Sequence, residues 1–216
     1  MKKAIILFNL GGPDKLENVE PFLFNLFYDP AILNLPKFLR FPLAKIISNR
    51  RAPTAKKIYQ ELGGSSPILK LTAEQSNALE NKLNQDDSNN EYKCFIVMRC
   101  WHPRAENVID DVKAYNPNEV VLLPLYPQYS AATSGSSIKE WKDICKKNNF
   151  ETKTSTICCY PSDGSFIKGH VQEIEKNIKN IKNYKLIFSA HGLPEQNIKK
   201  GDPYQWQVEQ TVNSVI

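Results

Sequence analysis

Four short stretches carry side chains that could do chemistry, and each follows an apolar run typical of a buried strand. They are NLGGP (9–13), RCWHP (99–103), LYPQYS (125–130) and SAHGLP (189–194). Ligands of open parallel sheets bind beyond the carboxyl ends of the strands, so we expect these stretches to meet at one cleft. The cleft would hold one cation, two imidazoles, aromatic walls and hydroxyls, from Arg99, His102, Tyr126, Tyr129, Ser130 and His191.

His191 is one of only three histidines in the chain. Taken alone, its position fits a structural role and a chemical role equally. The chemical role is open to it because a neutral imidazole can accept a proton near neutral pH or bind a metal. AHGLP is similar to the oxyanion loop of lipases, but no G-x-S-x-G elbow and no H-E-x-x-H motif is present, which argues against a hydrolase. A structural role is favoured for His102, which precedes a proline. His170 lies in an amphipathic helical pattern and is expected at the surface or at the boundary of the core.

Charge and cysteine content narrow the class of protein further. The net charge of +5 comes from 28 basic and 23 acidic residues spread along the 216 residues. Nucleic acid is therefore not an expected partner, because it requires a concentrated basic stripe. Five cysteines without a C-x-x-C pair, and no export signal, predict reduced thiols and a cytoplasmic location.

Short β-rich runs alternate with longer helical ones, which is the pattern of an α/β protein with a mostly parallel sheet. The expected strands are nearly continuous in apolar residues, which favours a sheet buried on both faces. They lie at 4–9, 93–99, 119–125, 152–158 and 184–189. The expected helices lie at 17–28, 37–48, 54–62, 68–84, 104–115, 134–149, 163–182 and 203–216.

We expect a new unit to begin near residue 118, which divides the chain into an N-terminal half at 1–117 and a second half at 118–216. The stretch 22–47 is apolar but interrupted by prolines and basic residues. This composition suits a lip along an apolar cleft or peripheral contact with the inner membrane surface, and a buried pair of core helices is the alternative. The final residues, VEQTVNSVI, resemble the interior of a helix, which indicates that the second half is incomplete.

Six stretches together resemble the ferrochelatase family, whose enzymes insert ferrous iron into protoporphyrin in the last step of haem biosynthesis. They occur in the family's order and cover nearly the whole chain, which makes the combination far more specific than any single stretch. They are LFNLGGPD (7–14), NRRAPTAKKIYQELGGSSPI (49–68), RCWHP (99–103), LYPQYSAATSGSS (125–137), FSAHGLP (188–194) and GDPY (201–204). The resemblance implies a lyase of two Rossmann-like halves, with parallel sheets flanked by helices and the porphyrin between them.

The resemblance also implies roles for single residues. His191 corresponds to the family's active-site histidine, proposed as proton acceptor, iron ligand or both. The implied partners are protoporphyrin IX and ferrous iron, the iron being a substrate and not a prosthetic group. The residues that match porphyrin-contacting or cleft-lining positions of the family are Arg51, Tyr59, Ser66, Arg99, Tyr126 and Ser130.

Two positions depart from the family's pattern. Cys100 stands where a tyrosine usually follows the arginine, and Ala131 stands where animal enzymes have a cysteine that helps to hold an iron–sulfur cluster. We therefore expect no such cluster. Family members run further and carry an acidic residue that faces the histidine, so we expect this chain alone to be inactive.

Two other functions remain open. One is a chelatase for coproporphyrin or another tetrapyrrole, and the other is a non-catalytic porphyrin-binding protein. Leu10 in the first loop favours the protoporphyrin type, because the coproporphyrin enzymes tend to carry a tyrosine in this loop.

Overall fold

One parallel sheet forms the centre of the molecule. The structure, a computed structural model, describes residues 1–178 and 184–216. The strands are β1 (Lys2–Asn9), β2 (Glu91–Met98), β3 (Glu119–Pro124) and β4 (Lys153–Thr156), in the order β2-β1-β3-β4. Ile6 in β1 pairs with Phe95 of β2 on one side and with Leu122 of β3 on the other. This arrangement confirms the α/β class and four of the five expected strands.

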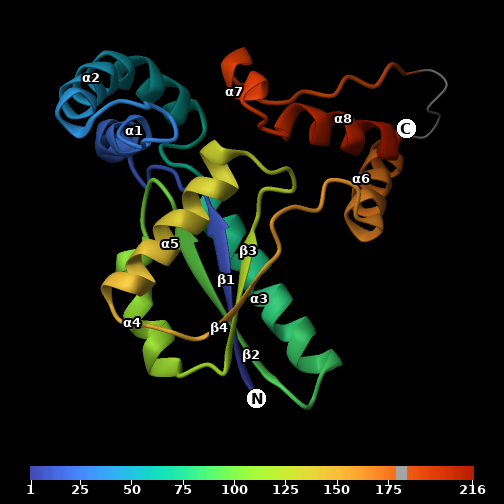
Figure 1. Ribbon diagram of the computed structural model, residues 1–216. Coiled ribbons are helices and arrows are strands. Elements are labelled where there is room, and N and C mark those ends of the chain that lie inside the picture. The colour runs from blue at the N-terminus through green and yellow to red at the C-terminus, as the bar shows by residue number, and fades with distance from the viewer. Residues whose placement is uncertain (179–183) are drawn as a thin grey trace.

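Helices cover both faces of the sheet, as the continuous apolar strands predict. The helices α4 (Ala105–Tyr115) and α5 (Ser136–Lys147) lie on one face, and α3 (Ile68–Asp86) lies on the other (Figure 1). Ile6 and Phe8 of β1 pack with Val108 of α4 and Trp141 of α5 in the main core. On the α3 side, the amide of Asn9 donates a hydrogen bond to the hydroxyl of the buried Thr72.

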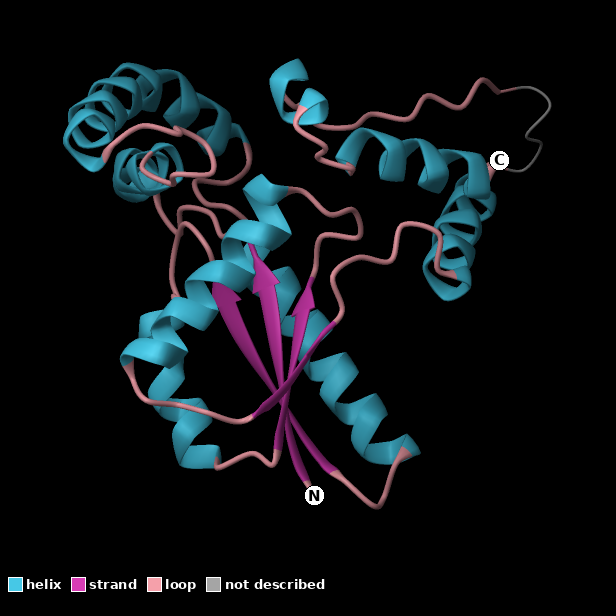
Figure 2. Ribbon diagram, viewed as in Figure 1, coloured by secondary structure: helices cyan, strands magenta, loops and turns pink. Residues whose placement is uncertain are grey.

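A helical hairpin lies beyond the carboxyl ends of the strands, as the arrowheads in Figure 2 show. It consists of α1 (Val19–Phe27) and α2 (Lys37–Glu61). The predicted division into two helices, at 37–48 and 54–62, is wrong, because α2 is continuous through Pro42 and Pro53. Its buried residues recur every fourth position: Arg40, Ala44, Ser48 and Ala52. These mostly small side chains pack α2 against its neighbours. This packing compensates for the stability lost with the backbone hydrogen bond that each proline cannot donate.

The chain after β4 contains α6 (Gly164–Asn177), α7 (Glu195–Lys199) and α8 (Tyr204–Val215). The expected strand at 184–189 is wrong: this segment is extended chain outside any strand, and Ile187 is 86% exposed. A strand requires a neighbour for its backbone hydrogen bonds, and among the described residues no strand lies beside this one. The predicted helix at 163–182 is confirmed in α6, while its residues from 179 onward lie outside the described part.

The predicted boundary at 117/118 falls between α4 and β3, inside the sheet. β3 follows this boundary and nevertheless pairs with β1, which precedes it. One sheet thus uses strands from both predicted halves. The described residues after β4 form helices and loops, and the division into two halves stays a prediction.

Candidate active site

An apolar cleft of about 680 Å³ lies beyond the carboxyl ends of β1 and β3, between the α1–α2 hairpin and the segments before α7 and α8. Its volume falls within the range of small-molecule sites. The walls are mainly aliphatic and aromatic, with Leu23, Phe27 and Ile58 on one side and Leu125 and Leu193 on the other. Its charged or polar side chains are Asp29, Arg51, Thr54, Gln128, Thr133 and His191.

Two of the predicted loops meet at the base of this cleft because their backbones are hydrogen-bonded. The amides of Arg99 and Cys100 donate to the carbonyls of Asn9 and Leu10, each at 2.8 Å. Gly11 has a φ of +82°, and a side chain there would lie 3.0 Å from Cβ of Trp101. Glycine is therefore required at this turn for both its conformation and its close approach. The NLGGP loop is therefore held in close contact with the RCWHP segment.

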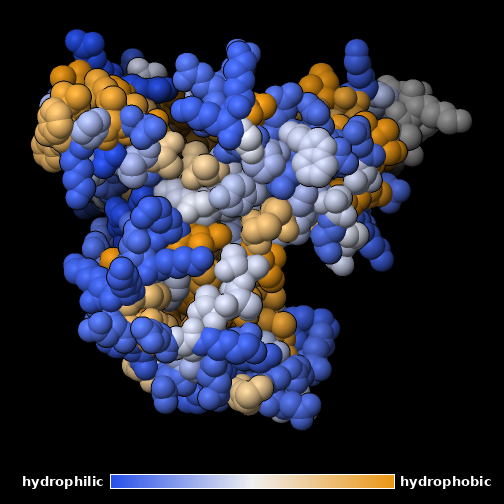
Figure 3. Space-filling model, viewed as in Figure 1, coloured by the Kyte–Doolittle hydropathy of each residue, from blue (hydrophilic) through white to orange (hydrophobic). Residues whose placement is uncertain are grey.

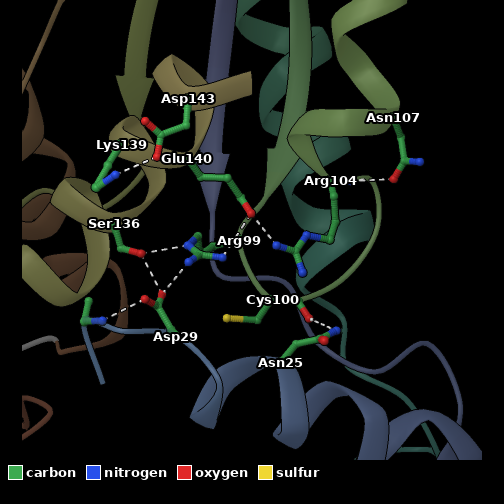
Figure 4. A network of polar contacts seen from close by, with 11 residues as sticks. Asn25, Asp29, Arg99, Cys100, Arg104, Asn107, Ser136, Lys139, Glu140 and Asp143 are labelled. Atoms are coloured by element: carbon green, nitrogen blue, oxygen red, sulfur yellow. Dashed lines mark hydrogen bonds and ion pairs between the residues drawn. The ribbon is translucent and has the colours of Figure 1, made fainter. Parts of the chain in front are cut away.

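A network of largely buried charges, shown in Figure 4, adjoins the cleft through Asp29. The guanidinium of Arg99 contacts Asp29 at 2.9 Å, Glu140 at 3.1 Å and the hydroxyl oxygen of Ser136 at 2.7 Å. Ser136 in turn donates to Asp29 at 2.6 Å, and Arg104 pairs with Glu140. The Asp29 side chain is only 2% exposed and that of Arg99 11%. Two cations and two anions balance, which is the condition under which charges can be buried.

Three of the predicted site residues line the cleft. Arg51 is exposed on α2, and its guanidinium lies 5.7 Å from the centre of the Phe27 ring. Among the described residues no carboxylate pairs with Arg51. His191 is also exposed and lies at the edge of the cleft, while Tyr126 forms part of the inner wall. Burial raises the pKa of the Tyr126 phenol far above its usual value, so this side chain stays neutral.

The other predicted site residues lie outside the lining. Arg99 is held in the buried network, and Ser130 is buried, with its hydroxyl donating to Asp202 at 2.9 Å. Ser66 packs against Gly12, where an added Cβ would come within 2.4 Å of its oxygen. Tyr59 packs half-buried against a small cluster that includes Trp101. Each of these four supports an element that borders the cleft without facing it.

The remaining two residues predicted for the cleft, His102 and Tyr129, do not line it. His102 is exposed at the start of α4, with its ring nitrogen 3.3 Å from the amide oxygen of Asn107. Tyr129 lines a neighbouring, more polar hollow that it shares with Arg99 and Glu140. Among the described residues, no group of three or more His, Cys, Asp or Glu side chains is arranged to hold a metal ion.

Several cleft residues were not predicted from the sequence. Asp29, Cys100, Gln128 and Tyr204 all line the cleft. A signal for Asp29 existed, because it is the single acidic residue within the apolar stretch 22–47. Burial raises the pKa of the Cys100 thiol to about 12, so this side chain is a neutral part of the wall.

The fold and the cleft define an α/β protein with an apolar cleft at the carboxyl ends of a parallel sheet, bordered by a cation and an imidazole. Comparison with known proteins specifies the family. The family model described as Ferrochelatase matches residues 2–216. The chain belongs to the ferrochelatase family.

Individual relatives agree with this assignment. The chain is 76% identical to the ferrochelatase of Pelagibacter ubique (strain HTCC1062) over 216 residues, all of this chain and 63% of the relative. It is 52% identical over 219 residues to the ferrochelatase of Wolbachia sp. subsp. Drosophila simulans (strain wRi), again over all of this chain and 69% of that relative. The ferrochelatase of Rickettsia felis is 52% identical, with 62% of its length matched. The chain thus spans roughly two thirds of the length of these relatives.

Proposed function

We propose that the protein is a ferrochelatase, which inserts Fe²⁺ into protoporphyrin IX to form protohaem with release of two protons. The observation that carries this proposal is the apolar cleft with Arg51 and His191 at its edge. A porphyrin is a flat apolar ring with acidic propionate groups, and it requires such walls together with a cation. Family membership over residues 2–216 supports the same reaction.

The roles that we assign to the polar residues follow from the chemistry of metal insertion. His191 accepts a proton from a porphyrin N–H group and offers its neutral nitrogen to the incoming ferrous ion, since imidazole suits both tasks. Arg51 pairs with a propionate, because a guanidinium holds a carboxylate in a two-point contact. The apolar walls bind the rest of the ring, and binding over this surface supports bending of the macrocycle at the reacting centre.

We also propose that the reaction proceeds without an iron–sulfur cluster. Ala131, at the position where some family members have a cluster cysteine, has no atom that can bind iron. Elemental analysis of the purified protein for iron and acid-labile sulfide tests this point. Stoichiometric amounts of both would contradict it.

A chimaera tests the proposed function directly. In it, residues 1–216 replace the matched segment of the Pelagibacter ubique relative, which supplies the rest of a full-length protein. We expect anaerobic incubation with Fe²⁺ and protoporphyrin IX to give protohaem, measured by its pyridine haemochrome spectrum. Preference for coproporphyrin would favour the alternative chelatase, and tight porphyrin binding without insertion would favour a non-catalytic protein. Either result would overturn the proposed reaction.

We further propose peripheral membrane contact through the hairpin that was predicted as an apolar lip. Phe38 is 75% exposed, Phe41 55% and Ile46 51%, all on α2. Figure 3 shows apolar, orange atoms gathered over this region of the molecule. No helix within the described residues is both long and apolar enough to cross a bilayer. A cytoplasmic protein that touches the membrane here would receive its apolar substrate next to the cleft.

Sedimentation with vesicles tests this contact. Replacing Phe38 and Phe41 by serine removes exposed apolar surface from the hairpin, and we expect weaker binding to vesicles that contain phosphatidylglycerol. Leu69→Ser with Leu71→Ser is the matched control, because these leucines are exposed on α3, at 39% and 50%. Equal binding of both double variants would contradict the membrane contact.

A further inference from the structure

Two neighbouring thiols lie in the loop between β4 and α6, outside the residues that the proposed reaction uses. The sulfur atoms of Cys158 and Cys159 are 2.9 Å apart. Cys158 is exposed and Cys159 is half-buried. The remaining cysteines lie elsewhere, Cys94 on β2, Cys145 on α5 and Cys100 in the loop after β2. An accessible thiol beside a second one is the arrangement of cysteines that respond reversibly to oxidation, because the second thiol can resolve the oxidised first.

The thiol pair is connected to the wall of the cleft. The side-chain amide of Gln207, on α8, donates to the sulfur of Cys159 at 3.5 Å. The oxygen of the same amide accepts from the backbone N–H of Tyr129 at 2.6 Å, and Gln207 is only 7% exposed. The backbone N–H of Tyr160 donates to the carbonyl of Pro127 at 2.8 Å. A change at the thiols therefore acts on the segment 125–130, which supplies part of the cleft wall.

We propose that Cys158 and Cys159 form a reversible disulfide when the protein meets hydrogen peroxide. The thiolate of Cys158 attacks one peroxide oxygen, the O–O bond breaks, and a sulfenic acid and one water result. The sulfur of Cys159 then attacks the sulfur of Cys158, the S–O bond breaks, and a second water leaves. Two thiols lose two electrons and two protons in total, and one peroxide is reduced to two waters.

The geometry predicts that this disulfide is easily reduced. Closing the bond brings the sulfurs together by less than about 1 Å, since an S–S bond is about 2.05 Å long. Adjacent residues have Cα atoms about 3.8 Å apart, however, below the usual range for disulfides, so the bond is strained. Strained and exposed disulfides are the labile ones. The pair suits a reversible sensor and not a structural crosslink.

The other thiols are poor competitors for peroxide. Burial raises the pKa of Cys94 and Cys100 to about 12 and that of Cys145 to about 11, and the thiolate is the reactive form. The pKa of Cys158 is also raised, chiefly by its hydrogen bond with Cys159. Selectivity for Cys158 therefore follows from its exposure and from the neighbouring sulfur, and not from unusual acidity.

Mass spectrometry and thiol counting on the purified 216-residue chain test the proposal. Brief treatment with hydrogen peroxide should lower the intact mass by about 2 Da and the free thiols from five to three, with the crosslink mapped to 158–159. Dithiothreitol should restore both values. Cys158→Ser should abolish the crosslink, and Cys145→Ser should retain it.

Amide hydrogen exchange tests whether oxidation of the thiol pair alters the cleft wall. Oxidation should speed exchange in residues 125–130 and leave the amides of β1 unchanged. An unchanged thiol count, overoxidation of one cysteine without a crosslink, a crosslink in Cys158→Ser, or a crosslink without faster exchange would each overturn the proposal. None of these readouts uses porphyrin or iron, so their outcome is independent of the proposed function.

Discussion

Replacing Asp29 by alanine removes the central acceptor of the buried charge network, and we expect it to destabilise the fold strongly. Asp29 accepts from Arg99 at 2.9 Å, from Ser136 at 2.6 Å and from the backbone N–H of Ala31 at 2.9 Å. Its side chain is 2% exposed, so water cannot replace these contacts. The variant leaves a guanidinium and a hydroxyl with fewer partners in the interior.

The size of the stability loss in Asp29→Ala depends on which ion pairs Arg99 keeps. Breaking a buried ion pair by removing one partner costs about 3–5 kcal/mol. Arg99 keeps Glu140 at 3.1 Å, which places the expected loss near the lower end, about 3 kcal/mol. For a chain of this size that loss lowers the melting temperature by roughly 6–12 °C. Asp29→Asn keeps the shape and one acceptor oxygen, so its loss should be smaller than that of Asp29→Ala.

Urea unfolding followed by circular dichroism measures these losses by linear extrapolation. Lys139→Ala is the matched control on α5, because the Lys139–Asp143 pair is exposed at 73% and 64%. Such a surface pair contributes about 0–1 kcal/mol. An Asp29→Ala protein as stable as Lys139→Ala would refute the view that the network holds the cleft in place.

Three further substitutions test other parts of the structure. Gly12→Ala places a Cβ 2.4 Å from the Ser66 oxygen and should lower the unfolding free energy by about 1–3 kcal/mol, and adding Ser66→Gly should restore it. Gly169→Ala is the control, because its Cβ would lie in open space on α6 and should not destabilise the protein. An equal loss in both single variants would contradict the packing argument. The Tyr126 hydroxyl is buried without a hydrogen-bond partner among the described residues, so Tyr126→Phe should change the unfolding free energy by less than about 1 kcal/mol, and a loss above about 2 kcal/mol would reveal a missed partner. The Asp14 carboxylate accepts hydrogen bonds from the side-chain amide of Asn18 at 2.7 Å and from the indole N–H of Trp101 at 3.1 Å. These bonds, chiefly the one from Asn18, lower the pKa of Asp14 below its ordinary value. The resulting stability is present above the unfolded-state pKa and is lost as the pH falls through the folded-state pKa, so Asp14→Asn should be less stable than wild type at neutral pH and equal to it in strong acid; a constant difference would contradict this.

The sheet could be predicted because β1, β2 and β3 contain short, continuous apolar runs that local sequence identifies. β4 is instead an exposed polar segment, KTST, whose β-branched threonines favour a strand. The run at 184–189 has the same apolar pattern without a strand, because a strand also depends on a neighbour that local sequence does not specify. The gap expected at 49–53, between two helices, was wrong for a similar reason. Packing of α2 through Ala44 and Ala52 outweighs the local preference.

Three of the predicted site residues border the cleft. His191 and Tyr126 were predicted from their residue types in loops after expected strands, whereas Arg51 was predicted only from the family resemblance. Arg99 was expected to face a ligand, but its partners Asp29 and Glu140 come from distant parts of the chain, and their pairing is a tertiary event. The same holds for Ser130, whose hydroxyl is held by Asp202.

Iron insertion by histidine variants of the chimaera with the Pelagibacter ubique relative tests the central claim most directly. His191→Ala should retain porphyrin binding, measured by the Soret spectrum, and lose roughly 100-fold or more in the rate of protohaem formation. His170→Ala is the control, because this histidine packs against Phe166 on α6, apart from the cleft lining, and it should keep the wild-type rate. A His191→Ala protein that inserts iron at the wild-type rate, or an equal loss in both variants, would contradict the assignment of His191 as the proton-accepting, iron-facing group.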